Sequence, residues 1–294
     1  MDILTERRFG KACAVVIGKF DGVHTGHKRL LNLTADICKN ENLIPVAYTF
    51  ESRGDCIISE NEKIRILSEN GIEAVFVQPF TVEFKNTTPE EFVNMLKDDF
   101  TARHIIIGFN FRFGKGRCGS AEDMVSLCNS AGIGVTVAEP VIYENEPVSS
   151  TRIRDSIRNG NIPSANEMLG RMFSISGIVV HGKQLGRKMG FPTANIDTAD
   201  ISVLPEKGVY ATVVDSYPAI TNIGLNPTVD TDGMVKAETH IMGDTVPDYG
   251  EEITVHFLEK IRDEKTFSDI EELKSQLDKD KQTAIEIYEK SVRN

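Results

Sequence analysis

The feature that most constrains this chain is a glycine-rich turn near its start, Gly18-Lys-Phe-Asp-Gly-Val-His-Thr-Gly-His27. A short apolar run at residues 14–17 precedes the turn and predicts a buried strand, and the periodic leucine and isoleucine pattern after it predicts a helix. Glycines that lead into a helix N-terminus leave backbone N–H groups exposed at the positive end of the helix dipole. The turn therefore predicts a site for an anion, and most readily for a phosphate.

His24 and His27 lie in this turn, three residues apart. Imidazoles can donate hydrogen bonds to phosphate oxygens as negative charge builds up in a transition state. Two other interpretations are open: half of a zinc site, although no nearby cysteine or carboxylate pattern completes the ligand set, and ordinary surface histidines. The glycine-rich setting favours phosphate, and the absence of Gly-x-x-x-x-Gly-Lys-Ser/Thr excludes the Walker type of loop.

Composition narrows the classes of protein. The length of 294 residues is enough for two domains, each with its own core. A net charge of −11 argues against binding to a nucleic-acid backbone or to an anionic membrane. It does not argue against binding of a small nucleotide in a local site. No apolar run approaches the roughly 20 residues of a membrane helix. The N-terminus lacks an apolar signal core, and the five cysteines show no Cys-x-x-Cys spacing, so we expect reduced thiols and a cytoplasmic protein.

The first half of the chain alternates strand and helix patterns from residue 12 to about 140. Five apolar strands are expected, at residues 14–17, 43–50, 74–77, 104–108 and 134–138. Between them lie helical patterns, one of which opens with a predicted capping box, Thr88-Pro-Glu-Glu91. Continuous apolar strands separated by helices predict a parallel sheet covered on both faces, with ligands beyond the carboxyl ends of the strands.

The pattern changes near residue 170, after a helical stretch at about residues 150–169. Strand patterns then follow one another, at residues 173–180, 208–214, 219–223, 237–242 and 251–258. Turn residues separate them without helical patterns, which predicts an antiparallel barrel or sandwich. A last helix is expected to start at a capping box formed by Ser268 and Glu271 and to run towards Tyr288.

Two more segments of the first half carry charge and hydroxyls. Residues 108–119 mix glycines, aromatics and cations, which suits a nucleotide but also a polar surface loop with a buried Phe or two. Ser149-Ser-Thr-Arg-Ile-Arg154 begins a helix, so its hydroxyls serve as N-caps, and they can form a phosphate clamp at the same time. Together with the histidine turn this makes two anion sites, which suits a triphosphate cleaved between its α- and β-phosphates.

The second half contains Gly182-Lys-Gln-Leu-Gly-Arg-Lys-Met-Gly-Phe-Pro-Thr-Ala-Asn195. Its glycines and cations can wrap the polyphosphate of ATP. The alternative is a barrel loop in which Pro and Gly serve only the turn. Thr193 and Asn195 project to the same side of an extended chain and offer the oxygens that Mg²⁺ prefers. Glu238 shares one face of a strand with His240; most strand glutamates are merely solvated, but phosphoryl transfer to an alcohol needs such a base.

These motifs, in this order, resemble the bacterial bifunctional riboflavin kinase/FAD synthetase family over nearly the whole chain, from about residue 12 to 285. The resemblance implies an α/β nucleotidyltransferase-like domain with an HxGH signature and a Rossmann-like parallel sheet at residues 1–169, the FMN adenylyltransferase (FAD synthetase). It implies a riboflavin kinase-like antiparallel β-barrel with a C-terminal helix at residues 172–294. The activities would be ATP-dependent phosphorylation of riboflavin to FMN and adenylylation of FMN to FAD with release of pyrophosphate.

The resemblance also implies residue roles. Glu238 would be the kinase base, Thr193 and Asn195 would hold Mg²⁺, and His24 and His27 would act on the phosphates of ATP. ATP and its phosphates would further contact Gly18, Phe20, Gly22, Asn110, Ser150, Thr151, Arg154, Gly182, Lys183, Gly186 and Arg187, as well as Thr193 and Asn195.

The expected cofactor is Mg²⁺ with ATP as co-substrate, and the expected partners are riboflavin, FMN, FAD and ATP, without nucleic acid or membrane. Two alternatives are a nucleotidyltransferase for another phosphorylated substrate and a non-catalytic flavin-binding regulatory protein. The intact histidine pair and the set of Thr193, Asn195 and Glu238 argue against the second, because a pure binder needs none of them.

Overall fold

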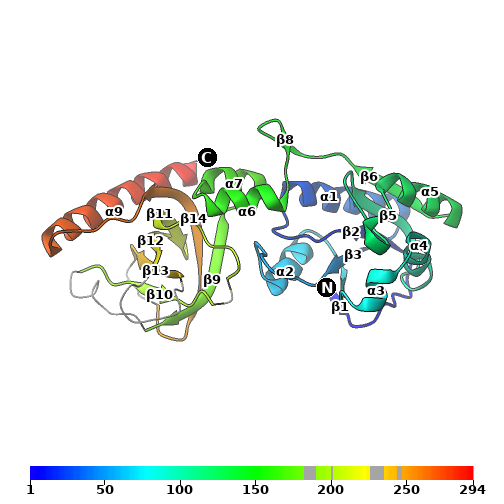
Figure 1. Cartoon of the computed structure of the whole chain (residues 1–294), viewed down its shortest axis with the longest axis horizontal. Helices are drawn as coiled ribbons and strands as arrows, with labels where there is room; N and C mark the ends of the chain where they lie inside the picture. Colours follow the sequence, from blue (N-terminus) through cyan, green and yellow to red (C-terminus); the bar gives the residue numbers. More distant parts are fainter. Residues whose placement is uncertain (182–189, 200, 226–234, 244–246, 294) are drawn as a thin grey trace. The chain divides into compact units, whose positions relative to one another are not determined.

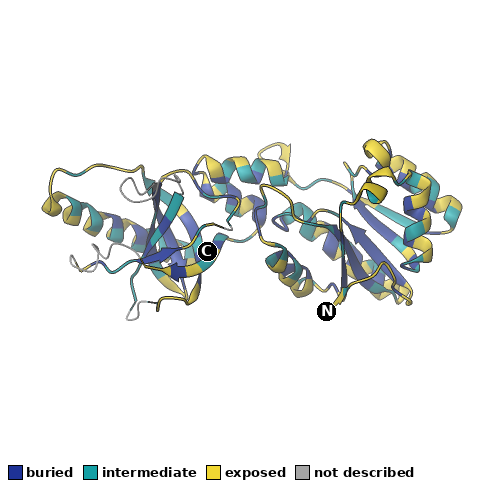
Figure 2. Ribbon diagram, turned by 60° about the horizontal axis from the view of Figure 1, so that its bottom comes forward, coloured by how far each residue is buried: buried dark blue, intermediate teal, exposed yellow. Residues whose placement is uncertain are grey.

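The computed structural model describes the chain except for residues 182–189, 200, 226–234, 244–246 and 294. It divides into two compact units, Met1–Ser150 and Thr151–Asn294, which are treated separately below. In both units the central strands are the most buried elements, whereas the helices are buried on one side only (Figure 2). None of the described helices is long and apolar enough to cross a membrane.

The first unit is built on a parallel six-stranded sheet (Figure 1). Its order is β1-β4-β3-β2-β5-β6, and all neighbouring strands are parallel. The strands are β1 (Asp2–Leu4), β2 (Cys13–Ile17), β3 (Ile44–Phe50), β4 (Ala74–Gln78), β5 (Ala102–Gly108) and β6 (Gly134–Ala138). The five expected strands are confirmed. The chain runs from β2 to β3 on one side and later places β5 on the other, so the carboxyl end of β2 is a topological switch point where ligands bind in such sheets.

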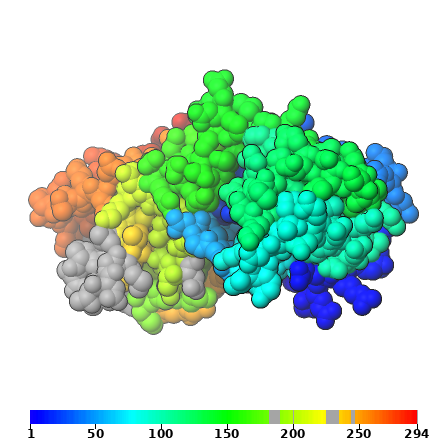
Figure 3. All heavy atoms as spheres, turned by 45° about the vertical axis from the view of Figure 1, so that its right-hand side comes forward, coloured from blue at the N-terminus to red at the C-terminus, as the bar shows by residue number. Residues whose placement is uncertain are grey.

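Helices cover both faces of this sheet. Val15 and Ile17 of β2 share a core with α4 (Pro89–Asp98) and α5 (Ala121–Ala131), whereas α1 (Thr25–Glu41) contacts β2 from the opposite face. Figure 3 shows α4 and α5 as part of the turquoise to green outer surface of this unit. The remaining elements are α2 (Glu60–Glu69), α3 (Val82–Asn86), the short 3-10 helix Lys115–Arg117, and the small hairpin of β7 (Ile142–Tyr143) and β8 (Glu146–Pro147). The predicted capping box of Thr88 and Glu91 is confirmed at the start of α4.

The second unit contains a closed antiparallel barrel, as expected, with the order β10-β13-β12-β11-β14-β9. Its strands are β9 (Phe173–Val180), β10 (Ala194–Ile196), β11 (Gly208–Val214), β12 (Tyr217–Leu225), β13 (Val235–Ile241) and β14 (Glu252–Arg262). On one face of the strands, hydroxyl hydrogen bonds of 2.9 Å link Thr212 to Thr221 and Thr221 to Thr239, all fully buried. Among the residues that the structure describes, the helices of this unit are α6 (Ser150–Arg158, which begins at the boundary), α7 (Ile162–Leu169) and α9 (Ile270–Arg293).

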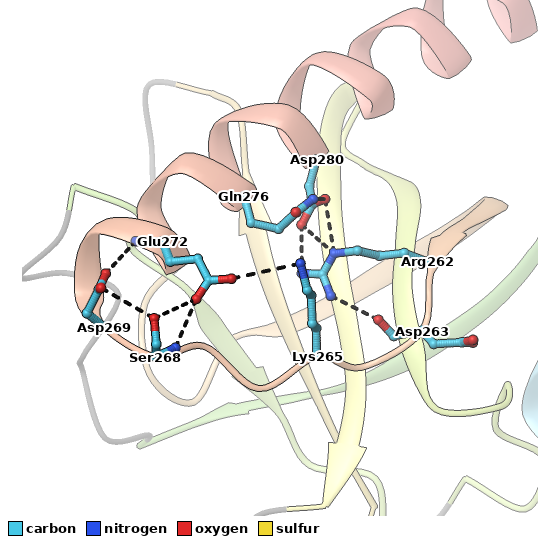
Figure 4. A network of polar contacts seen from close by, with 8 residues as sticks. All are labelled: Arg262, Asp263, Lys265, Ser268, Asp269, Glu272, Gln276 and Asp280. Atoms are coloured by element: carbon cyan, nitrogen blue, oxygen red, sulfur yellow. Dashed lines mark hydrogen bonds and ion pairs between the residues drawn. The ribbon is translucent and has the colours of Figure 1, made fainter.

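The long helix α9 packs on the outer face of β11 and β12 and is fixed by a buried ion pair (Figure 4). Arg262 at the end of β14 donates from Nε and Nη2 to the carboxylate of Asp280, which is 1% exposed. The predicted capping pair at the start of this helix was shifted by one residue. Asp269 rather than Ser268 accepts the backbone N–H of Glu272, and Glu272 rather than Glu271 reaches back to Ser268, because the helix begins at Ile270.

Candidate functional site

The histidine turn begins where β2 ends and is held in an unusual backbone conformation. Gly18 N–H donates to the carbonyl of Tyr48 on β3 at 3.2 Å. Phe20 (φ +52°) and Val23 (φ +37°) both lie in the left-handed region that non-glycine residues rarely adopt, and both are fully buried. A β-branched residue pays for this conformation in strain, and such strain gathers at functional sites where the surroundings fix it. The surrounding structure therefore fixes the conformation of this turn.

The two imidazoles are stacked, with ring centroids 3.7 Å apart. His24 is the N-cap of α1, and its Nδ1 accepts the backbone N–H of His27 at 3.3 Å. Because Nδ1 of His24 is an acceptor, the proton of the neutral ring lies on Nε2, which can then donate to a ligand oxygen. A Cβ at Gly26 would lie 3.1 Å from the His24 ring, closer than most such contacts, so glycine favours this close approach.

His27 carries the clearest sign of a missing partner. Its Nδ1 is buried and has no hydrogen-bond partner among the described residues. Burial, with a smaller contribution from His24, lowers the pKa of His27 well below its usual 6.5, so the ring is neutral at pH 7. Buried polar atoms nearly always have a partner, and a ligand oxygen would supply one here.

Asp21 joins the turn to two other parts of the unit. Its carboxylate accepts the N–H of Ile57 at 2.7 Å, and its backbone carbonyl accepts the hydroxyl of Ser150 at 2.9 Å. The structure thus brings Ser150 to the histidine turn across 129 positions of sequence. The hydroxyl of Thr49 adds a third connection, to the carbonyl of Lys19 at 3.2 Å.

Sequence reasoning missed Lys63, which supports the same edge of the sheet. This lysine is 2% exposed, and its ammonium donates to the carbonyl of Phe50 at 2.8 Å and to the hydroxyl of Ser52 at 3.2 Å. Burial lowers its pKa. The available signal was its place in the buried stripe of α2, three and four residues before Ile66 and Leu67. Lys63 thereby fixes the start of the segment 51–58, whose Ile57 donates its backbone N–H to Asp21.

The other predicted residues of this region divide between core and surface. Asn110 is exposed just beyond β5, the strand next to β2, while Phe113 is buried in the core and stacks on Phe111. The loop therefore has the buried Phe of the surface-loop interpretation, and its contact with a nucleotide stays a prediction. Thr151 and Arg154 lie on α6 in the second unit, where Arg154 Nη2 donates to Thr151 Oγ1 at 3.3 Å. Gly22 has φ +79°, as its place in the turn requires.

The second site is a polar row on the outer face of the barrel. Strand register places Asn195 of β10 opposite Glu238 of β13, and Glu238 opposite Asn222 of β12. Directly opposed residues project from the same face, so the three side chains stand side by side. Asn195 is 8% exposed, and Thr193 immediately precedes β10. Gly182, Lys183, Gly186 and Arg187 lie outside the described residues.

His240 continues this face of β13 two residues beyond Glu238. Its Nδ1 lies 2.8 Å from the carbonyl of Pro192, so that nitrogen carries the proton and donates it. Burial lowers the pKa of His240. A cavity of about 640 Å³ opens here, lined among others by Pro192, His240, Met242 and Tyr288. Within the described ranges no three His, Cys, Asp or Glu side chains gather into a metal-binding group.

Comparisons with known proteins match both halves of the chain. A family model for riboflavin kinase matches residues 169–288, and one for FAD synthetase matches residues 6–152. The bifunctional riboflavin kinase/FMN adenylyltransferase of Escherichia coli K12 is 33% identical over 95% of this chain and 93% of its own length. The Bacillus subtilis protein of the same name is 30% identical over 93% and 92%. A crystal structure described as a macrolide-efflux protein from Streptococcus pneumoniae has a TM-score of 0.87 and 30% identity over 96% and 97% of the two chains.

Proposed function

The chain belongs to the family of bifunctional riboflavin kinase/FMN adenylyltransferases, and from this premise we propose how its two sites divide the chemistry. The protein uses ATP twice, once to phosphorylate riboflavin to FMN and once to adenylylate FMN to FAD. Membership favours these activities over both alternatives, a nucleotidyltransferase for another substrate and a non-catalytic flavin-binding protein. We assign the adenylyl transfer to residues 1–169, so that α6 with Thr151 and Arg154 serves it, and the kinase to residues 172–294.

In adenylyl transfer, an oxygen of the FMN phosphate attacks the α-phosphorus of ATP in line. The bond from that phosphorus to the oxygen bridging the β-phosphate breaks, and pyrophosphate leaves. His24 and His27 donate to the phosphate oxygens as charge builds on them, and the backbone around Gly18, Phe20 and Gly22 lines the nucleotide. Ser150, Thr151 and Arg154 hold the polyphosphate, and Asn110 holds the nucleotide or the flavin. The unpartnered Nδ1 of His27 is the observation that carries this proposal.

In the kinase reaction, Glu238 accepts the proton of the ribityl 5′-hydroxyl while its oxygen attacks the γ-phosphorus of ATP and ADP leaves. Thr193 and Asn195 offer the hydroxyl and amide oxygens that suit Mg²⁺, and Asn195 stands beside Glu238 in register. When bound, Mg²⁺ would neutralise charge on the phosphates of ATP. Gly182, Lys183, Gly186 and Arg187 complete the grip on the polyphosphate.

We further propose the cytoplasm as the compartment, because all five cysteines are unpaired. The net charge of −11 supports a protein that works on small molecules, without nucleic acid or an anionic membrane.

The division is tested with two variants of the full chain, incubated with riboflavin, Mg²⁺ and ATP and followed by chromatography. The change His27→Ala should stop the formation of FAD and spare that of FMN. The change Glu238→Ala should stop the formation of FMN from riboflavin but spare that of FAD from added FMN. Loss of both activities in either folded variant would contradict two separate sites.

A further inference from the structure

Glu264 brings a second carboxylate to the face of the barrel that carries Glu238. This residue lies two positions beyond β14, and its Oε1 occupies the space where a Cβ of Gly224 would be. Asn222 Nδ2 lies 3.2 Å from the same point. Gly224 and Asn222 are two residues apart on β12 and share a face, so carboxylate and amide meet over one short stretch of that strand.

The segment that carries Glu264 is fixed at both ends (Figure 4). Before Glu264, the side chain of Arg262 is bound by Asp280. After Glu264 comes Phe267, whose ring lies 5.8 Å from the guanidinium of Arg262 and 5.9 Å from the ammonium of Lys265. Ser268 is then held by Glu272 at the start of α9. Among the residues that the structure describes, neither Glu264 nor Asn222 has a hydrogen bond or ion pair of its own. The chain on both sides of Glu264 is thus fixed, while its exposed carboxylate and the half-buried amide of Asn222 stay open to a ligand.

The order of the strands in the barrel shows on which side of Glu238 these two groups lie. In the closed barrel, β13 with Glu238 lies between β10 and β12. Asn195, proposed to bind the metal and nucleotide, is on the β10 side, whereas Asn222 and Glu264 are on the β12 side. A base that takes a proton from an alcohol during phosphoryl transfer contacts the hydroxyl from the side, while the hydroxyl oxygen faces the γ-phosphorus of ATP. A carboxylate on the donor side would repel the polyphosphate, so the β12 side is the side of the acceptor.

We propose that Glu264 and Asn222 form the subsite that binds the hydroxyl groups of the ribityl chain of riboflavin, an inference that rests on the proposed role of Glu238. A carboxylate accepts hydrogen bonds from hydroxyls, and an amide both donates and accepts them. Diagonal neighbours on paired strands are roughly 7–8 Å apart, so Glu264 over Gly224 lies one step along the sheet from Glu238. The 5′-hydroxyl meets Glu238, and the secondary hydroxyls of the same chain reach Glu264 and Asn222.

Two substitutions in the full chain test the subsite from opposite sides. The change Glu264→Gln keeps the size of the side chain and removes its charge. The change Gly224→Ala leaves the carboxylate intact but puts a methyl group in its place, and only the flexible end of Glu264 must move. Each should raise the KM for riboflavin about tenfold or more, as expected for losing a hydrogen bond to a charged group, and leave the KM for ATP unchanged. The double variant should equal Glu264→Gln alone.

Controls distinguish this subsite from the proposed role of Glu238 as the kinase base. Formation of FAD from added FMN should stay at the wild-type rate. The change Glu259→Gln, at an exposed glutamate on β14, should leave all constants unchanged. With riboflavin analogues that lack single ribityl hydroxyls, wild type and Glu264→Gln should have the same KM for the analogue that lacks the bound hydroxyl. A wild-type KM for riboflavin in both variants, a raised KM for ATP, or an equal penalty with every analogue would overturn the subsite. Riboflavin kinase activity in the Glu238→Gln variant would instead overturn the proposal that Glu238 is the base.

Discussion

The two sites of this protein are built in different ways. The histidine turn is contiguous: Gly18, His24 and His27 lie within ten residues, and a strained local backbone sets their positions. The barrel row is assembled from strands far apart in the sequence, because Asn195, Asn222 and Glu238 meet only through the register of β10, β12 and β13. A local site depends mainly on the conformation of its own turn and on the few side chains that support it. A register site depends on everything that holds the barrel closed.

The largest expected effect comes from breaking the distant support of the barrel. Arg262→Met leaves the carboxylate of Asp280, 1% exposed, buried without its cation. Removing one partner of a buried pair typically costs about 3–5 kcal/mol, so the free energy of unfolding of the second unit should fall by that amount. Thermal unfolding of the variant, monitored by its loss of kinase activity, measures this change in stability.

The matched control for that change is Lys265→Met. Its partner Glu272 is 3.9 Å away, and the lysine side chain is 55% exposed, so the loss should be at most about 1 kcal/mol. FAD formation from FMN should keep its temperature dependence in both variants. An equal loss from Arg262→Met and Lys265→Met would remove the special role of the buried pair.

The next effect isolates the local site. His24→Ala removes both a ring that we assign to the phosphates and the N-cap of α1. The kcat of adenylyl transfer should fall about 10²–10³-fold, the range for losing one donor to a developing charge, and stability by about 1 kcal/mol.

His24→Asn separates the two roles of this residue, because asparagine is a good N-cap but lacks the ring. The free energy of unfolding should return to the wild-type value, while kcat should remain low. Recovery of both together would mean that His24 acts only as a cap.

A smaller effect tests whether the local site is local throughout. Lys63→Met keeps the apolar stem but leaves the carbonyl of Phe50 and the hydroxyl of Ser52 without their donor. Leaving a buried acceptor unpaired costs about 1–3 kcal/mol, and the loss should appear in adenylyl transfer because the segment 51–58 binds Asp21. Steady-state kinetics with FMN and ATP measures it. Riboflavin kinase activity in the same sample is the control, and an equal fall in both would point to general destabilisation.

The contrast between the sites also explains what could be predicted from the sequence. The histidine turn, the strands at 14–17 and 104–108 and the cap of Thr88 are local patterns, and the structure confirms them as elements. The short strand β1 was missed because three residues carry no period, and it forms only by pairing with β4. The contacts of Lys63 and the approach of Glu264 to Gly224 depend on segments that meet only after folding. The cap of α9 was misplaced by one residue because Ser268 and Asp269 are both good caps, and the position where α9 begins decides between them.

The smallest effect concerns the charge of the local site. Because burial lowers the pKa of His27 well below 6.5, the folded protein binds fewer protons at this ring than the unfolded chain when the pH falls below 6.5. Stability therefore falls with decreasing pH through this region, by at most about 1.4 kcal/mol per pH unit from this group. Chemical denaturation of wild type and His27→Gln between pH 7.5 and 5 gives the contribution as a difference, which cancels groups that titrate alike in both. The difference should be flat above pH 6.5 and grow below it, in favour of the variant. A barrel variant is the control. For Glu238→Gln, the difference from wild type in the free energy of unfolding of the first unit should not grow below pH 6.5. If the wild type gained stability relative to His27→Gln on acidification, His27 would be protonated in the folded protein, and its role as a neutral donor would have to be abandoned.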